Sequence, residues 1–236
     1  MKKRIILKLS GEALGGNSQG IDHGKVLDVA REIKNLYDQG GIQLAIVVGA
    51  GNIWRGRDAI EHGMNRSSAD YMGMLGTILN ALALQSAFET IGLDARVMTS
   101  LSIPQVAEPY IRGRALSDLE KDRIVIFGGG TGVPYFSTDT TAALRSCELG
   151  ADLILMAKNG VDGVYDKDPR KYEDAKRFVK LNHQDLISKN LQVMDLTAAA
   201  ICKDNNVDIY VFDMNKPGNI AKAVKDYSFG TLITSK

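Results

Sequence analysis

The sequence predicts an α/β fold with a largely parallel sheet. Short runs rich in β-branched residues alternate with amphipathic helical segments, and glycine-rich loops follow three of these runs. Hydrophobic residues make up 44% of the 236 residues and charged residues 24%, as in ordinary globular proteins. This composition excludes a disordered or fibrous chain, and the length corresponds to one large or two small domains.

The first part of the chain alternates between strands and helices. Residues 4–9 form the first predicted strand, and residues 21–39 form a helix with Asp22 as its N-cap and Gly40 just past its end. A second strand at 43–48 completes one strand–helix–strand unit. The next predicted elements are a helix at 67–91, strands at 95–99 and 123–127, a helix at 139–149 and a strand at 153–156.

The pattern changes after residue 156. Residues 159–168 are rich in Gly and Asp and predict a hairpin or lid rather than a crossover helix. Alternation returns with a helix at 196–203, a strand at 207–212, a helix at 219–225 and a strand at 231–234. If there are two lobes, we expect the division near Gly150, between two parts of one continuous sheet.

Charge, cysteines and the N-terminus indicate no membrane or nucleic-acid partner. The formal net charge is only +1, so any anion site must be local. Cys147 and Cys202 are too few for a disulfide framework or a zinc site, and we expect both to be buried and reduced. The basic N-terminus lacks a hydrophobic region of sufficient length for a signal peptide, which predicts a cytoplasmic protein.

Residues 71–88 contain no charged residue. Their amides, hydroxyls and glycines make them too polar to cross a membrane. A helix that is apolar on most sides is otherwise buried in a core or at a subunit interface. The segment therefore predicts a buried helix and an oligomer.

Glycine-rich loops follow three predicted strands, at residues 10–16, 49–52 and 128–132. Backbone N–H groups in such loops can approach a phosphate closely, and parallel strands bring the loops to one edge of the sheet. We therefore expect ligands at the carboxyl edge; the alternative is that the glycines simply form turns. The P-loop and dinucleotide-binding fingerprints are both missing from these loops.

Two charged residues stand at ends of predicted elements near these loops. Lys8 shares a strand face with Ser10 and is placed to neutralise a transferring phosphoryl group, or else it is a solvated strand-end lysine. Asp139 is either the N-cap of a helix or a carboxylate that holds Mg²⁺ through water or positions a lysine.

The glycine-rich loops contain no histidine. We expect His23, His62 and His183 to be surface or structural residues. Phosphoryl transfer to an acceptor that is already an anion needs positioning and charge neutralisation but no general base. The absence of histidine is consistent with that chemistry.

Six blocks of sequence, in order along the whole chain, resemble the bacterial uridylate (UMP) kinases of the amino-acid-kinase superfamily. The blocks are residues 8–14 (KLSGEAL), 49–56 (GAGNIWRG), 69–75 (ADYMGML), 130–139 (GTGVPYFSTD), 161–165 (VDGVY) and 193–196 (VMDL). The resemblance implies a three-layer α/β/α sandwich, with residues 1–236 as one amino-acid-kinase-like domain. Within it, an acceptor-side lobe would span about 1–150 and an ATP-side lobe about 151–236.

The resemblance also implies an activity. Members of the family transfer the γ-phosphoryl group of ATP to UMP, giving UDP, and use Mg²⁺ that arrives with ATP rather than a metal bound directly by the protein. A homohexamer, activation by GTP and inhibition by UTP are further expectations that the resemblance carries.

The family's functional residues map onto positions of this sequence that match its motifs. The implied catalytic residues are Lys8, Asp139 and Asp195. The implied ATP-binding residues are Lys8, Leu9, Ser10, Gly11, Gly51, Arg55, Asn159, Tyr165 and Asp168. The implied UMP-binding residues are Ala50, Asp70, Thr131, Gly132, Val133, Pro134, Tyr135, Phe136, Ser137 and Thr138. The implied GTP effector residues are Gly16, Asn17, Ser18, Gln19, Gly20, Ile21, Arg96 and Arg123.

Two positions depart from the family pattern and bear on UMP contacts. Ala50 replaces the middle glycine of a triple glycine, which is tolerable only if its φ is negative. Val133 replaces an asparagine whose amide could bind substrate. Two other functions stay open: a superfamily kinase acting on a carboxylate or carbamate, and a non-catalytic nucleotide sensor or anion-storage protein. Asp70 and the aromatic and hydroxyl residues at 135–138 fit a nucleoside better than a small acid.

Overall fold

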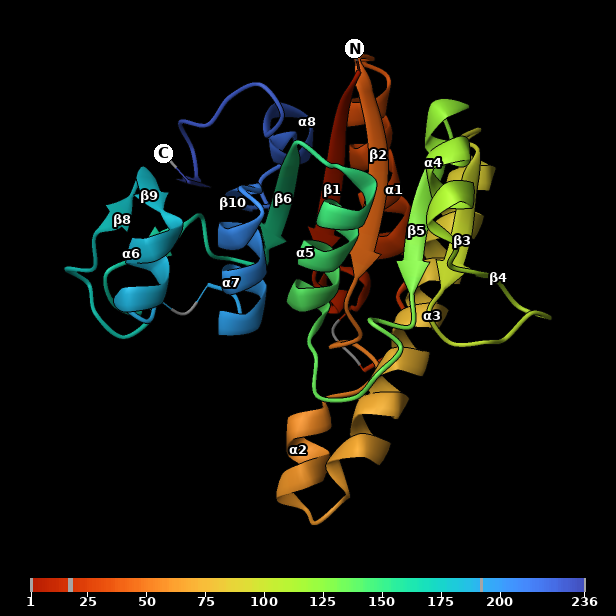
Figure 1. Cartoon of the computed structure of the whole chain (residues 1–236), viewed down its shortest axis with the longest axis horizontal. Coiled ribbons are helices and arrows are strands. Elements are labelled where there is room, and N and C mark those ends of the chain that lie inside the picture. Colours follow the sequence, from red (N-terminus) through yellow and green to blue (C-terminus); the bar gives the residue numbers. More distant parts are fainter. Residues whose placement is uncertain (1, 17–18, 192, 236) are drawn as a thin grey trace.

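A large sheet forms the centre of the molecule (Figure 1), in a computed structural model that describes residues 2–16, 19–191 and 193–235. Its strands are β1 (Lys3–Leu9), β2 (Ile42–Val48), β3 (Ala95–Thr99), β4 (Glu108–Pro109), β5 (Ile124–Gly128), β6 (Leu153–Lys158), β9 (Lys180–Asn182), β10 (Asp208–Asp213) and β11 (Thr231–Thr234). The strand order is β4-β3-β5-β2-β1-β6-β10-β11-β9. Neighbouring strands are parallel except β10 and β11. The predicted largely parallel sheet is confirmed.

Helices cover both faces of this sheet. One buried cluster holds side chains of α1 (His23–Tyr37), α3 (Arg66–Thr90) and α8 (Asn219–Lys222). The other holds side chains of α4 (Arg112–Glu120), α5 (Thr138–Leu149), α6 (His183–Ser188) and α7 (Leu196–Asp204). The expected three-layer α/β/α sandwich is confirmed.

Three further elements complete the fold. The short 3₁₀ helix η1 (Gly11–Leu14) follows β1, and α2 (Gly56–Glu61) projects beyond the sheet at the bottom of Figure 1. The strands β7 (Val164–Tyr165) and β8 (Arg177–Phe178) pair antiparallel, as expected for a hairpin after residue 159.

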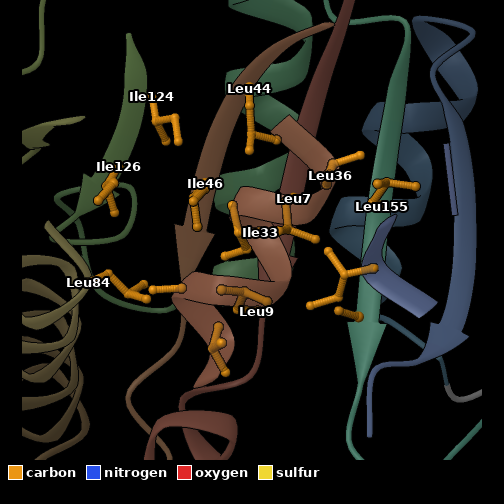
Figure 2. Packing of buried hydrophobic residues seen from close by; sticks show 14 of the residues in the cluster. Leu7, Leu9, Ile33, Leu36, Leu44, Ile46, Leu84, Ile124, Ile126 and Leu155 are labelled. Carbon is orange, nitrogen blue, oxygen red and sulfur yellow. The ribbon is translucent and has the colours of Figure 1, made fainter. Parts of the chain in front are cut away.

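Alternation along β1 determines which face each of its side chains reaches. Leu7 and Leu9 pack in the cluster that includes Ile33 of α1 (Figure 2), whereas Ile6 packs in the cluster on the opposite face. Because successive side chains of a strand point to opposite faces, Lys8 lies on the same side as Ile6. That side is covered by α5, which carries Asp139 in its first turn.

The helices α1, α3, α5 and α7 agree with the sequence prediction, and the remaining helices depart from it. Asp22 caps α1 by accepting a hydrogen bond from the backbone N–H of Lys25 at 3.0 Å. The helix expected at 219–225 is too long, because α8 ends at Lys222. The helices α2, α4 and α6 were not predicted; α2 and α6 have only six residues each, too few for a strong hydrophobic period. The edge strands β4 and β9 were not predicted either.

The N-cap of α5 is Ser137 and not Asp139. The Ser137 hydroxyl accepts hydrogen bonds from the backbone N–H groups of Asp139 at 2.9 Å and Thr140 at 3.2 Å. This arrangement leaves the Asp139 carboxylate free to turn toward the end of β1.

The prediction of a buried helix at 71–88 is only partly correct. One face of α3 packs in the core through residues such as Ala81, Leu84 and Phe88. The opposite face exposes a set of apolar side chains: Tyr71, Met72, Leu75 and Leu79. Within one chain the helix is therefore half covered.

The cysteines and histidines take mostly the expected positions. Cys202 is buried, but Cys147 of α5 is only partly buried; both are free thiols. His23 and His62 are exposed, and His183 is buried at the start of α6.

Candidate active site

The loops after β1, β2 and β5 meet at the carboxyl edge of the sheet, at the lower side of Figure 1. The first two loops are in backbone contact, because a Cβ added at Gly11 would lie 2.6 Å from the Gly49 carbonyl oxygen and 2.7 Å from the Gly51 nitrogen. Strands β2 and β6 flank β1 on opposite sides, so the chain direction across the sheet reverses there. Ligands of open α/β sheets bind at such a reversal.

An ion pair lies at this reversal. Lys8 Nζ is 2.8 Å from Asp139 Oδ1, and both side chains are largely buried. Burial alone would raise the pKa of Asp139, but the charges of Lys8 and Lys158 and the contact with Lys8 outweigh it and hold that pKa below its ordinary value. Asp139 is therefore a carboxylate at neutral pH and keeps an ammonium group in place beside the glycine loops.

A second lysine, Lys158, lies at the same point and was missed by the sequence analysis. It ends β6, which pairs with β1, and its ammonium donates to the Val193 carbonyl. Burial lowers the pKa of Lys158, and the Lys8 charge adds to that effect while Asp139 opposes it. The charges of Lys8 and Lys158 thus both act on the one buried carboxylate of Asp139, although only Lys8 is paired with it among the described ion pairs.

Asp195 connects α7 to the start of α5. Its carboxylate caps α7 by accepting from the Ala198 backbone N–H at 2.9 Å, and it accepts from the Thr140 hydroxyl at 3.0 Å and from the Ser137 hydroxyl. Asp195 therefore holds the start of α5, the helix that carries Asp139. Among the described contacts, Lys8 pairs with Asp139 and not with Asp195.

The predicted acceptor residues form a second group at the start of α3. Asp70 Oδ2 accepts a hydrogen bond of 2.8 Å from the Tyr135 backbone N–H. Arg66 lies 3.5 Å from the same carboxylate, and its guanidinium is 4.8 Å from the centre of the Tyr135 ring. Tyr135 has a φ of +73°, which is unusual for a bulky residue and marks a strained turn.

The rest of the 131–138 loop joins this acceptor group to the ion pair. Within the loop, the Thr131 hydroxyl donates to the Val133 carbonyl at 3.0 Å. At its far end, Thr138 Oγ1 lies 3.6 Å from the position of a Cβ added at Gly49, so the loop ends against the second glycine loop. Exposed side chains stand between these ends: Val133, Tyr135 and Phe136.

The two sequence departures are accommodated differently. Ala50 is buried and does not have a positive φ. Its methyl group is therefore tolerated in the second glycine loop. Val133 is half exposed in the loop, where it presents an apolar surface in place of an amide.

The predicted ATP-binding residues fall into two neighbouring hollows. Gly51, Arg55 and Asn159 line a hollow of about 700 Å³, in which Arg55 Nη2 lies 2.8 Å from Glu12 Oε1. Tyr165 and Asp168 line another of about 600 Å³ that also reaches Lys158.

Leu9 and Ser10, which are predicted to contact the ATP phosphates, lie at the end of β1 and just after it. Leu9 is fully buried, so only its backbone is available: its carbonyl accepts from the Gly49 N–H at 3.0 Å. Ser10 stands at the N-cap position of η1, and its carbonyl accepts from the Ala13 N–H at 3.1 Å.

The predicted effector residues are not brought together within one chain. Gln19 and Gly20 bind the second glycine loop: Gln19 Nε2 donates to the Ile53 carbonyl at 2.8 Å, and the Gly20 N–H donates to the Asn52 carbonyl at 2.7 Å. Gly16 and Ile21 flank this contact, and Asn17 and Ser18 lie outside the described residues.

The two arginines of the predicted effector set lie elsewhere. Arg96 and Arg123 stand at the amino ends of β3 and β5, and both lie 2.8 Å from carboxylate oxygens of Asp94. This is the opposite end of the sheet from the glycine loops.

The described residues contain no cluster of three or more His, Cys, Asp or Glu side chains that could hold a metal ion alone. The hard oxygen donors near the ion pair are the Asp195 carboxylate and the Ser137 and Thr140 hydroxyls. Such donors fit Mg²⁺ that is bound mainly by nucleotide phosphates and reaches the protein through water. Within the same described ranges, no helix is long and apolar enough to cross a membrane.

Comparison with known proteins gives a consistent set of relatives. The model of the amino acid kinase family matches residues 3–213. A uridylate kinase of Aster yellows witches'-broom phytoplasma is 57% identical over 100% of this chain and 98% of its own length. A uridylate kinase of Limosilactobacillus reuteri is 58% identical over 98% of this chain and 96% of its own length.

Solved structures agree with the sequence relatives. The crystal structure of a UMP kinase from Bacillus anthracis has a TM-score of 0.94 and 41% identity, covering 99% of this chain and 96% of the other. That of a UMP kinase from Ureaplasma parvum also has a TM-score of 0.94, at 37% identity and 99% coverage of both chains.

Proposed function

The chain belongs to the amino acid kinase family, and from this premise we propose that it transfers the γ-phosphoryl group of ATP to UMP, giving UDP and ADP in pyrimidine nucleotide biosynthesis. The full-length similarity to uridylate kinases supports this activity. The observation that carries it in the structure is the buried Lys8–Asp139 pair with Lys158 beside it, at the point where three glycine loops meet.

The two lysines are the groups that act on the transferring phosphoryl. Charge spreads over its three equatorial oxygens as it moves between nucleotides, and ammonium groups held in a buried site stabilise that charge strongly. Asp139 keeps Lys8 in position. The attacking group is a phosphate oxygen of UMP, already an anion, so no general base is required.

Recognition of the two nucleotides is divided along the carboxyl edge. Asp70 would accept from a ribose hydroxyl of UMP, and the loop at 131–138 would enclose the uridine and its phosphate. On the other side, the glycine loop at 8–11 with Gly51 and Arg55 would hold ATP phosphates. Adenosine would occupy the hollow lined by Tyr165 and Asp168, with Asn159 beside it.

In this proposal, magnesium enters the site bound to ATP. When bound, it neutralises phosphate charge and orients the nucleotide. Asp195, with the Ser137 and Thr140 hydroxyls, would hold its water shell, while Asp139 remains paired with Lys8.

We extend the proposal to regulation and assembly. GTP would activate and UTP would inhibit, and the contact of Gly20 with Asn52 supports a route from the 16–21 segment to the second glycine loop. Arg96 and Arg123 would meet that effector only across a subunit contact. The exposed apolar face of α3 supports a homo-oligomer, which we propose to be a hexamer in the cytoplasm.

A coupled assay tests the function. Mg-ATP is supplied with UMP, CMP, dUMP or carbamate in parallel, with and without GTP and UTP. The proposal predicts transfer to UMP, raised by GTP and lowered by UTP. Transfer to carbamate instead of UMP would make the chain a different kinase of the family, and UMP binding without transfer would make it a nucleotide sensor.

A further inference from the structure

Helix α3 places two polar side chains in its buried face, Thr77 and Asn80. Their exposed fractions are 3% and 0%. Residues three apart lie on the same side of a helix, so both point to the same neighbours. Buried hydroxyl and amide groups are costly unless they are hydrogen-bonded, so their partners indicate what they are for.

Thr77 binds the third glycine loop. Its hydroxyl oxygen accepts a hydrogen bond of 2.8 Å from the backbone N–H of Gly129 and donates one of 2.6 Å to the Met74 carbonyl within the helix. Gly129 is buried, so without Thr77 this N–H would lose its partner and remain shielded from water. The turn that leads into the acceptor loop is therefore anchored on α3.

Asn80 binds the second glycine loop. Its amide nitrogen donates to the Gly49 carbonyl at 2.7 Å and to Asn52 Oδ1 at 2.8 Å. The Asn52 amide donates back to Asn80 Oδ1 at 3.1 Å and onward to the Gly20 carbonyl at 3.0 Å. One buried amide thus holds both ends of the 49–52 loop.

The helix also approaches both loops too closely for a side chain to intervene. A Cβ added at Gly76 would lie 2.9 Å from the Ala50 Cβ, and one added at Gly128 would lie 3.1 Å from the Ile78 Cα. At these two points the loops pack directly against the helix, with no space for a larger residue than glycine. Movement of either loop would therefore break a defined set of contacts with α3.

We propose that Thr77 and Asn80 are positioning residues that hold the 49–52 and 128–132 loops on one helix and so fix the geometry of phosphoryl transfer. The inference rests on the proposed function, because it concerns the alignment of the two nucleotides. Displacement of a reacting group by about 1 Å can cost on the order of a hundredfold in rate. Neither side chain needs to touch a nucleotide for this effect.

Two substitutions of Thr77 distinguish the hydrogen bond of its hydroxyl from the packing of its side chain. Thr77→Val keeps the shape of the side chain and removes the hydroxyl, whereas Thr77→Ser keeps the hydroxyl. We expect Thr77→Val to raise the KM for UMP and lower kcat/KM about tenfold, with Thr77→Ser within about threefold of the unaltered chain. Thr90→Val is the matched control, since the exposed Thr90 hydroxyl donates to the Ser86 carbonyl of the same helix at 2.9 Å and contacts neither glycine loop among the described hydrogen bonds.

Asn80→Ala provides an independent test on the second loop, with the exposed Asn35→Ala as its control. We expect Asn80→Ala to lower kcat and raise the KM for ATP as well as for UMP, because Asn80 holds both ends of the 49–52 loop. All variants are assayed well below their melting temperatures, which circular dichroism determines.

UMP binding, measured by calorimetry without ATP, distinguishes the inference from the proposed function. Weaker UMP binding by Thr77→Val but not by Thr77→Ser supports the positioning role, whether or not the unaltered chain transfers phosphate. Absence of phosphate transfer by the unaltered chain would contradict only the proposed function. A lower melting temperature with unchanged binding, KM and kcat in both Thr77→Val and Asn80→Ala would overturn the inference.

Discussion

At the scale of single residues, the proposed transfer depends on Lys8. In that proposal, Lys8→Ala removes an ammonium group that would interact most strongly with the charge of the transition state. We expect kcat to fall on the order of a hundredfold or more, with much less change in UMP affinity. Initial-rate kinetics and calorimetry measure the two quantities, with the exposed Lys25→Ala as a control. Equal losses in kcat and in UMP binding would argue against a catalytic role for Lys8.

Asp139 links the site to the stability of the fold. The folded-state pKa of Asp139 lies below its value of about 3.9 in an unfolded chain, so its charge stabilises the protein at neutral pH. That contribution is lost as pH falls through the lowered folded-state pKa. Asp139→Asn leaves Lys8 and Lys158 without their carboxylate and should cost about 3–5 kcal/mol of unfolding free energy at pH 7.

Urea unfolding at a series of pH values from 7 down to 3 measures this effect. The difference in unfolding free energy between the unaltered chain and Asp139→Asn should narrow as the pH drops below about 4, because a protonated Asp resembles Asn. A difference that stays constant or widens in acid would show that the Asp139 charge is not the stabilising feature.

Part of the candidate site could be predicted from the sequence. Lys8 and Asp139 stand out there because one lies at the end of an apolar strand and the other opens a helix, and the structure pairs them. Lys158 was missed because the predicted strand ended at residue 156, whereas β6 continues to Lys158. Asp70 and Tyr135 came from the resemblance, and their contact depends on a turn with positive φ that no period in the sequence indicates.

At the scale of elements, α5 depends on its N-cap. Ser137→Ala removes the hydroxyl that accepts from two backbone N–H groups and donates to Asp195 of α7. Loss of an N-cap costs about 1 kcal/mol, which for a chain of this size lowers the melting temperature by about 2–4 °C. Calorimetric melting checks this, with the exposed Ser188→Ala at the end of α6 as the control. An equal decrease in both variants would contradict the capping role.

Elements could be predicted from sequence where they are long helices or continuous apolar runs. The helices α1, α3 and α5 are of the first kind. The strands β1, β2 and β5, which are buried over most of their length, are of the second. In contrast, α2 buries no residue, and β4 is only two residues long, so neither produces a hydrophobic period. The order of strands in the sheet depends on contacts between distant segments, which local patterns do not encode.

At the scale of the whole molecule, the exposed apolar face of α3 is the feature that supports the proposed assembly. Leu75 and Leu79 are 47% and 52% exposed in one chain. Contiguous apolar surface of this kind is typical of a protein interface. Leu79→Glu should therefore shift the protein toward smaller species in sedimentation velocity, because burial of a charge opposes association.

Val179→Glu is the control for this experiment, since Val179 is 62% exposed on the connection between β8 and β9. It should leave the sedimentation profile unchanged. A monomeric unaltered chain, or equal assembly by the unaltered chain and Leu79→Glu, would contradict an interface on this face.

A single-turnover experiment with ATP labelled in its γ-phosphoryl group tests the central claim most directly. The unaltered chain is mixed with labelled Mg-ATP and UMP, and the products are separated. The account predicts that the label appears in the β-phosphate of UDP, and that Lys8→Ala nearly abolishes this transfer. Label that stays in ATP or appears only as free phosphate, with UMP unchanged, would contradict it.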